Sequence, residues 1–137
     1  MATWKWCALV IPIFMTIDLL WLGVVMKSFY SREMGDLMRR NGDALAPRWG
    51  AAILVYLLLP LGLAIFVRPQ LTPSSPLWLA LAWGAAYGLV TYGTYDLTNF
   101  ATLEKWTLKL TVADMLWGCT LFGTVSAIMH LIARGES

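Results

Sequence analysis

The chain of 137 residues has few charged side chains. Asp, Glu, Lys and Arg make up 13% of it, whereas soluble globular domains carry about 25% charged residues. Hydrophobic residues make up 59%, and the mean hydropathy is +0.66. This composition excludes a disordered chain and a nucleic-acid-binding domain. The length allows one domain, over residues 1–137.

The sequence is also poor in residues that bind metals or form disulfides. Two cysteines are too few for the disulfide framework of a small secreted domain or for a thiolate metal site. His130 is the only histidine, so a histidine metal site is not expected either. The carboxylates of Asp18, Asp96 and Asp114 could take a hard cation, but nothing in their spacing demands one. The sequence therefore predicts neither a metal nor a cofactor.

Long apolar runs are abundant, and the alternation typical of strands is absent. A membrane-spanning helix needs about 20 mostly apolar residues. Four runs meet this need, at about residues 6–26, 49–67, 77–95 and 108–132. Because every backbone group must be paired in lipid, these runs are expected to be helices. We therefore predict an all-α fold, an integral-membrane four-helix bundle.

The three connections between these runs differ in character. The first, residues 27–48, has an apolar face at helical spacing, formed by Tyr30, Met34, Leu37 and Met38. This pattern predicts a short interfacial amphipathic helix in the headgroup plane. The second, residues 68–76, is rich in proline and is expected to be a turn. The third is the polar run 96–107, which is expected to be a loop.

Basic residues are concentrated on one side of the predicted membrane. The first and third connections share a side, which with its adjoining edge holds seven of the ten: Lys27, Arg32, Arg39, Arg40, Arg48, Lys105 and Lys109. The other side holds Lys5, Arg68 and Arg134. Because Lys and Arg favour the cytoplasmic side, we expect these two connections in the cytoplasm and both termini outside.

Two acidic side chains lie within the predicted spans. At 1.5 Å per residue, Asp18 lies about 12 Å and Asp114 about 9 Å from the cytoplasmic edge. An acid near the centre of a membrane helix costs about 2.5–3.5 kcal/mol, so both are expected to face the bundle interior or a wet cavity. Two interpretations stay open: a hydrogen-bonded tie between helices, and proton or cation handling.

Each acid begins the same short pattern, Asp-x-x-Trp. The first runs from Asp18 to Trp21, and the second from Asp114 to Trp117. This spacing places acid and indole on one helical face, so each indole is expected to close its own side of the acid pair. Packing and interface anchoring are the simpler interpretation of the tryptophans.

The densest polar segment follows the third apolar run. Its candidate residues for a polar cavity or a lipid-binding site are Tyr92, Thr94, Tyr95, Asp96, Thr98 and Asn99. Two of them, Asp96 and Asn99, are also expected to cap helix ends and to satisfy the loop backbone. Together with the two Asp-x-x-Trp patterns, this segment forms the candidate site.

Small residues recur every four positions in the third run, at Ala80, Gly84 and Gly88. Such a stripe lets two helices approach closely in lipid. We expect it to pack against a helix of the same chain, and an oligomer interface is the alternative.

Four segments resemble small bacterial membrane proteins of the family called domain of unknown function 2177. They are Asp18-x-x-Trp21-Leu-Gly23, Tyr56-x-x-x-Pro60-x-Gly62, Tyr92-Gly-Thr-Tyr-Asp-Leu-Thr-Asn99 and Asp114-x-x-Trp117-Gly118. The resemblance covers nearly the whole chain. It implies a four-span protein of the bacterial inner membrane, whose termini would then be periplasmic, with no settled activity. Genes of this family often lie beside those for cyclopropane-fatty-acid-synthase-like methyltransferases and flavin-dependent oxidoreductases, which implies a role in membrane-lipid modification or the oxidative-stress response.

Three functions stay open at this point. The sequence shows no recognised catalytic set, which favours an accessory subunit that contacts membrane lipids and a membrane-protein partner or a second copy of the chain. A small proton-coupled transporter is similar in its four spans and in the acid of its first span, a likeness of architecture alone. The third is a lipid-acting membrane enzyme in which the Asp96 cluster supplies acid–base groups.

Overall fold

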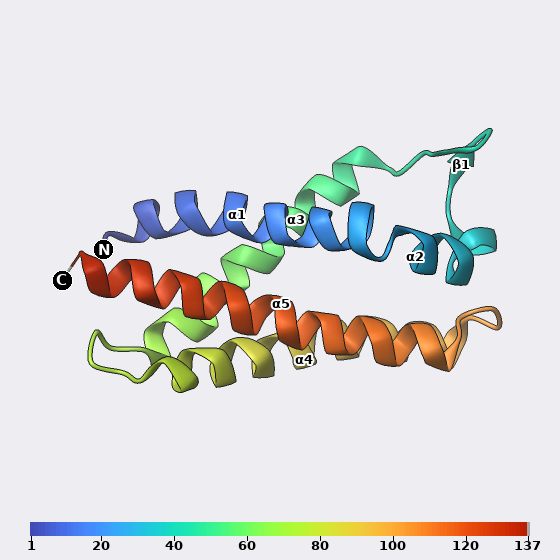
Figure 1. The fold of residues 1–137 in the computed structure, drawn as a ribbon. Coiled ribbons are helices and arrows are strands. Elements are labelled where there is room, and N and C mark those ends of the chain that lie inside the picture. Colours follow the sequence, from blue (N-terminus) through green and yellow to red (C-terminus); the bar gives the residue numbers. More distant parts are fainter. Residues whose placement is uncertain (137) are drawn as a thin grey trace.

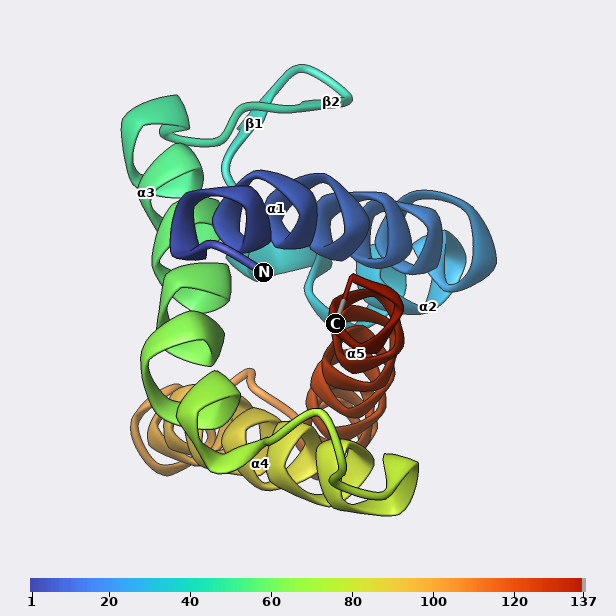
Figure 2. The same cartoon turned by 90° about the vertical axis from the view of Figure 1, so that its left-hand side faces the viewer.

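The computed structural model describes residues 1–136 and is built almost entirely of helices (Figure 1). The helices are α1 (Thr3–Leu20), α2 (Lys27–Glu33), α3 (Trp49–Gly62), α4 (Leu77–Thr102) and α5 (Leu108–Gly135). The prediction of an all-α fold is confirmed. Figure 2 shows α1, α3, α4 and α5 around a common centre, with α3 crossing obliquely from α1 to α4.

Among the described residues, three helical stretches are long and apolar enough to cross a membrane: Thr3–Val25, Trp49–Gln70 and Leu108–Gly135. The first continues α1 through a π-helical stretch, Trp21–Val25, and the second continues α3 through another, Leu63–Val67. The expected span at 77–95 lies in α4, which is long enough but contains many Tyr, Thr, Trp and Gly residues. A fourth span at this position stays a prediction.

The first connection contains a short helix followed by a hairpin. Helix α2 is only seven residues long, and in Figure 1 it continues roughly in the direction of α1. Strands β1 (Arg40–Asn41) and β2 (Ala44–Leu45) then pair antiparallel. The turn between them needs Gly42, whose φ of +62° is a left-handed conformation that glycine adopts easily. The expected absence of strands is therefore wrong here, because a hairpin this short leaves no alternating pattern.

The polar run expected as the third connection is mostly helical. Helix α4 continues to Thr102, so the connection shrinks to residues 103–107. Within α4, the hydroxyl groups of Thr94 and Thr102 donate to carbonyl oxygens four residues earlier, at 2.6 and 2.8 Å. These bonds satisfy the hydroxyl groups inside the helix, so polar residues do not end it. The capping role expected of Asp96 and Asn99 is wrong, because both lie inside α4; Thr107 is the cap, at the start of α5.

Helices α4 and α5 run antiparallel in close contact (Figure 1). A Cβ atom on Gly84 would collide with the carbonyl oxygen of Phe122, and one on Gly88 with that of Gly118. Ala80, on the same stripe, is fully buried. Close backbone contact of this kind compensates for the weak hydrophobic drive between helices in lipid. The stripe of small residues therefore lies against a helix of the same chain.

The best-packed part of the interior lies toward the end of the molecule that holds both termini. There Phe14 of α1 stacks on Phe122 of α5 at 5.4 Å between ring centroids, and Tyr87 of α4 meets Phe122 edge-on at 4.9 Å. At the other end, the N-terminal half of α3 diverges from the bundle, and its aliphatic side chains Ile53, Leu54 and Val55 are exposed. The candidate site lies in this divergent half.

Candidate functional site

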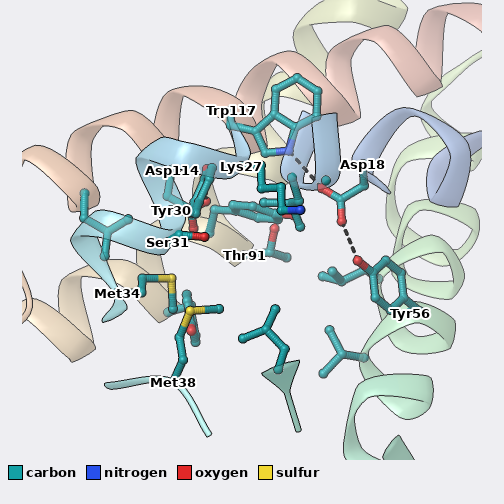
Figure 3. A pocket seen from close by; sticks show the side chains of 18 of the residues that line it. Asp18, Lys27, Tyr30, Ser31, Met34, Met38, Tyr56, Thr91, Asp114 and Trp117 are labelled. Atoms are coloured by element: carbon teal, nitrogen blue, oxygen red, sulfur yellow. Dashed lines mark hydrogen bonds between the residues drawn. The ribbon is translucent and has the colours of Figure 1, made fainter. Parts of the chain in front are cut away.

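A cavity of about 580 Å³ lies where α3 diverges from the other helices. Its volume falls within the range of about 300–1,000 Å³ that is usual for ligand pockets. Apolar side chains form much of its wall: Leu22, Met34, Met38, Leu45, Val55, Leu59, Leu110, Trp106 and Trp117. The polar side chains on the wall are those of Asp18, Lys27, Tyr30, Ser31, Tyr56, Thr91, Tyr92, Tyr95 and Asp114 (Figure 3).

Asp18 of α1 is held by donors from two other helices. The indole Nε1 of Trp117 donates to its Oδ1 at 2.9 Å, and the hydroxyl of Tyr56 donates to its Oδ2 at 2.9 Å (Figure 3). The residue is only 3% exposed. Because each carboxyl oxygen has a donor, the cost of burying this acid is reduced. These bonds also tie α3 and α5 to α1.

Asp114 of α5 is held through a relay of two side chains. The hydroxyl of Tyr30 donates to its Oδ1 at 2.7 Å, and the Nε1 of Trp21 donates to the Tyr30 oxygen at 3.3 Å. Burial raises the pKa of the Tyr30 hydroxyl, and the neighbouring Asp114 raises it further. Tyr30 therefore stays protonated at physiological pH and keeps its donor role.

The two indoles of the Asp-x-x-Trp patterns stack face to face. The ring centroids of Trp21 and Trp117 are 4.2 Å apart and the rings are nearly parallel, at 4°. Trp117 donates a hydrogen bond to Asp18, and Trp21 donates one to Tyr30, which in turn donates to Asp114. Each indole was expected to close its own side of the acid pair; instead the two indoles stack on each other, and each bonds toward the acid of the other helix.

The polar segment of α4 is divided between three environments. Tyr92 and Tyr95 line the cavity, whereas Thr94 and Thr98 are exposed and Asn99 is half-buried. Asp96 is completely buried next to Asp114 and is not on the cavity wall. Neither of its carboxyl oxygens has a hydrogen-bond partner among residues 1–136. The structure thus brings five of the candidate residues to one wall and leaves the others outside it or behind it: on the wall are Asp18, Tyr92, Tyr95, Asp114 and Trp117.

A known family matches residues 3–131, which is almost the entire chain. The chain belongs to this family of predicted membrane proteins, domain of unknown function 2177 (DUF2177). The resemblance seen in the sequence is confirmed. No curated protein and no solved structure matches the chain.

Five polar residues of this DUF2177 protein that line the cavity were not predicted as site residues: Lys27, Tyr30, Ser31, Tyr56 and Thr91. Tyr30 was assigned to the apolar face of an interfacial helix, and Tyr56 lies in an otherwise aliphatic run. A buried phenol needs an acceptor, and acidic side chains are the strong acceptors available within these helices. That requirement was the signal that could have paired the two tyrosines with the two acids.

Within the described residues, no group of three or more His, Cys, Asp or Glu side chains is placed to hold a metal ion. Both Cys7 and Cys119 are free thiols. The chemistry that the cavity offers is therefore that of carboxylates, phenols and one lysine in an apolar wall.

Proposed function

We propose that this protein is an accessory component of membrane-lipid modification, which holds an acyl chain of a membrane lipid in the 580 Å³ cavity for a partner protein. One observation supports this function above the others: a cavity with a largely apolar wall that carries a few hydrogen-bonded acids. Ligand pockets combine an apolar wall with a few polar groups that fix orientation. An acyl chain suits this wall, and Lys27 is available to an anionic headgroup or a carboxylate.

The position of α3 supports a sideways entry for the lipid. Val55 lines the cavity and is 51% exposed, so it stands at the rim. Its neighbours Leu54 and Leu58, which are not on the cavity wall, face outward and are more exposed still. An aliphatic rim of this kind would be in contact with lipid chains, and a chain would enter without leaving an apolar environment.

We further propose four spans in the bacterial inner membrane, with α4 as the third. At 1.5 Å per residue, a helix of 26 residues is about 39 Å long, which exceeds a hydrocarbon core of about 30 Å. Both termini lie at the same end of the molecule, as an even number of spans requires (Figure 1). The basic residues of the opposite end favour a cytoplasmic position for α2 and the hairpin, at headgroup level, and periplasmic termini. Labelling of single cysteines from each side tests this orientation, and a cytoplasmic C-terminus would overturn it.

Filling the cavity tests the lipid-binding function. In Val55→Trp, and in Leu59→Trp as a second variant, an indole would occupy part of the cavity. We expect a several-fold smaller lipid-bound fraction in native mass spectrometry of the protein released from mild detergent. Leu54→Trp places the same indole on the neighbouring, outward-facing position and should leave the lipid-bound fraction unchanged. Equal lipid binding by all four proteins, or none by the wild type, would contradict the proposal.

An accessory role also requires a partner protein that this chain assists. Co-purification from native membranes, followed by cross-linking, is expected to recover a membrane-protein partner. A chain that always isolates alone and whose deletion leaves the membrane lipids unchanged would count against this role.

Catalysis on the bound lipid is a second candidate, favoured because both Asp18 and Asp114 stand on the cavity wall. Asp18→Asn and Asp114→Asn would then alter the lipid composition of the membrane while the protein still binds lipid.

Transport is less well supported, because Phe14, Leu63 and Phe122 are completely buried between the cavity and the terminal end. Loss of proton-driven flux in vesicles carrying the two Asn variants would favour transport instead.

A further inference from the structure

A second hollow lies at the opposite end of the molecule, beside both termini. It has a volume of about 170 Å³ and is formed by the start of the chain, the segment after α3 and the end of α5. Its polar lining residues are Arg68, Thr72, His130 and Arg134. Arg68 lies near the end of one candidate span and Arg134 near the end of another, so the two guanidinium groups are at a similar level along the bundle.

Arg68 is held in place by neutral groups. Its Nη2 donates to the carbonyl oxygen of Met1 at 2.7 Å, and its Nη1 donates to the hydroxyl of Thr3 at 2.9 Å. The guanidinium also lies over the Trp6 ring, 5.9 Å from the centroid. These contacts fix the position of the guanidinium without neutralising its charge.

Among the described residues, no acidic side chain forms an ion pair with the arginines of this hollow. The ion pairs between residues 1–136 include neither Arg68 nor Arg134. On the far wall, the Nε2 of buried His130 donates to the carbonyl oxygen of Ser75 at 2.8 Å. The hydroxyl of Ser75 in turn accepts from the backbone N–H of Thr72 at 3.0 Å. Two cations therefore face the hollow at the end of three helical stretches.

We propose that this hollow binds a phosphate group, which either a phospholipid headgroup or free phosphate would supply. The planar guanidinium groups of arginine match the oxygens of phosphate in a bidentate manner, and such charge-assisted bonds are the strong ones. A hollow of this size fits a headgroup and not a whole lipid. Its position at the end of the candidate spans puts it at headgroup level. The site is separate from the acyl-chain cavity and does not depend on the function proposed for it.

Binding of three probes without acyl chains to the full chain tests this proposal: inorganic phosphate, the phosphatidylglycerol headgroup glycerophosphoglycerol, and glycerol, each followed by native mass spectrometry. We expect the phosphate-bearing probes to bind and the neutral glycerol not to bind. Arg134→Gln, at an exposed position, should weaken phosphate binding about tenfold or more. Arg68→Lys keeps the charge but loses the planar fork, and a smaller loss is expected.

The controls separate this site from the cavity. Arg40→Gln removes one positive charge at the other end of the molecule, in the hairpin, and should bind both phosphate probes as the wild type does. Val55→Trp, which alters the cavity, should also leave phosphate binding unchanged. Tighter binding of glycerophosphoglycerol than of phosphate identifies a headgroup as the ligand, and equal binding identifies free phosphate. The proposal is overturned if Arg134→Gln binds both as the wild type does, or if glycerol binds equally well.

Discussion

The two ends of the helix bundle are held together by different forces. Toward the terminal end, Phe14, Leu63 and Phe122 pack without exposed surface, and contacts between apolar and aromatic side chains predominate. At the cavity end, the helices are joined by hydrogen bonds to Asp18 and Asp114, around a space that is not filled. Dispersion contacts demand close packing, whereas a few directional bonds can hold helices apart. The bundle can therefore keep an open site at one end because the other end supplies the packing.

The largest expected effect comes from breaking the packed end. Phe122→Ala removes a ring that contacts Phe14 and Tyr87, and truncations of this kind cost about 3–5 kcal/mol in the free energy of unfolding. Thermal unfolding in detergent would measure the loss. The folded fraction should still bind lipid, because Phe122 is not on the cavity wall. Full stability of Phe122→Ala would show that the packed end is not what holds the bundle together.

A smaller but still large effect is expected at Asp18. Asp18→Ala leaves the buried Trp117 indole and the half-buried Tyr56 hydroxyl without their acceptor, and an unsatisfied buried donor costs about 1–3 kcal/mol in the free energy of unfolding. Asp18→Asn keeps the shape and one acceptor oxygen, so it should lose less. Denaturation followed by tryptophan fluorescence would rank the two variants. If Asp18→Ala proves as stable as Asp18→Asn, the bonds to this acid contribute little.

The smallest expected effect is at Tyr30. Tyr30→Phe removes one hydrogen bond to Asp114 and the acceptor of the Trp21 indole, and we expect a loss of about 1–3 kcal/mol or less. Combining it with Trp21→Phe in a double-mutant cycle isolates the relay, since the two changes should be less than additive. Additive losses would mean that Trp21 acts through its stack on Trp117 and not through Tyr30.

The contacts that these substitutions test could be predicted from the sequence only in part. The apolar runs predict the helices because lipid leaves the backbone no alternative, and the burial of Asp18 and Asp114 follows from the cost of exposing an acid there. Trp21 bonds toward the acid of α5 and Trp117 bonds to the acid of α1. This arrangement depends on the register between α1 and α5, and no local sequence pattern encodes that register. Tyr56 reaches Asp18 only because α3 crosses the bundle obliquely.

The polar segment shows a further limit of local patterns. Helix caps and helix interiors can both contain Asp, Asn and Thr, and the choice depends on whether the hydroxyl groups bond back to the helix. In α4 they do so at Thr91, Thr94 and Thr102, and the helix continues past Asp96. The sequence identified this segment as unusual, and the three-dimensional arrangement then divided it between the cavity wall, the interior and the surface.

The bonds around Asp18 also bear on how the chain is assembled. Asp18 belongs to α1, yet its indole partner follows 99 residues later in α5. Until α5 arrives, Tyr56 of α3 is the donor that can reach this acid from an earlier helix. In a chain interrupted before α5, one carboxyl oxygen of Asp18 would therefore lack its hydrogen-bond donor within the membrane. This unsatisfied acid would distinguish the interrupted chain chemically from one that includes α5.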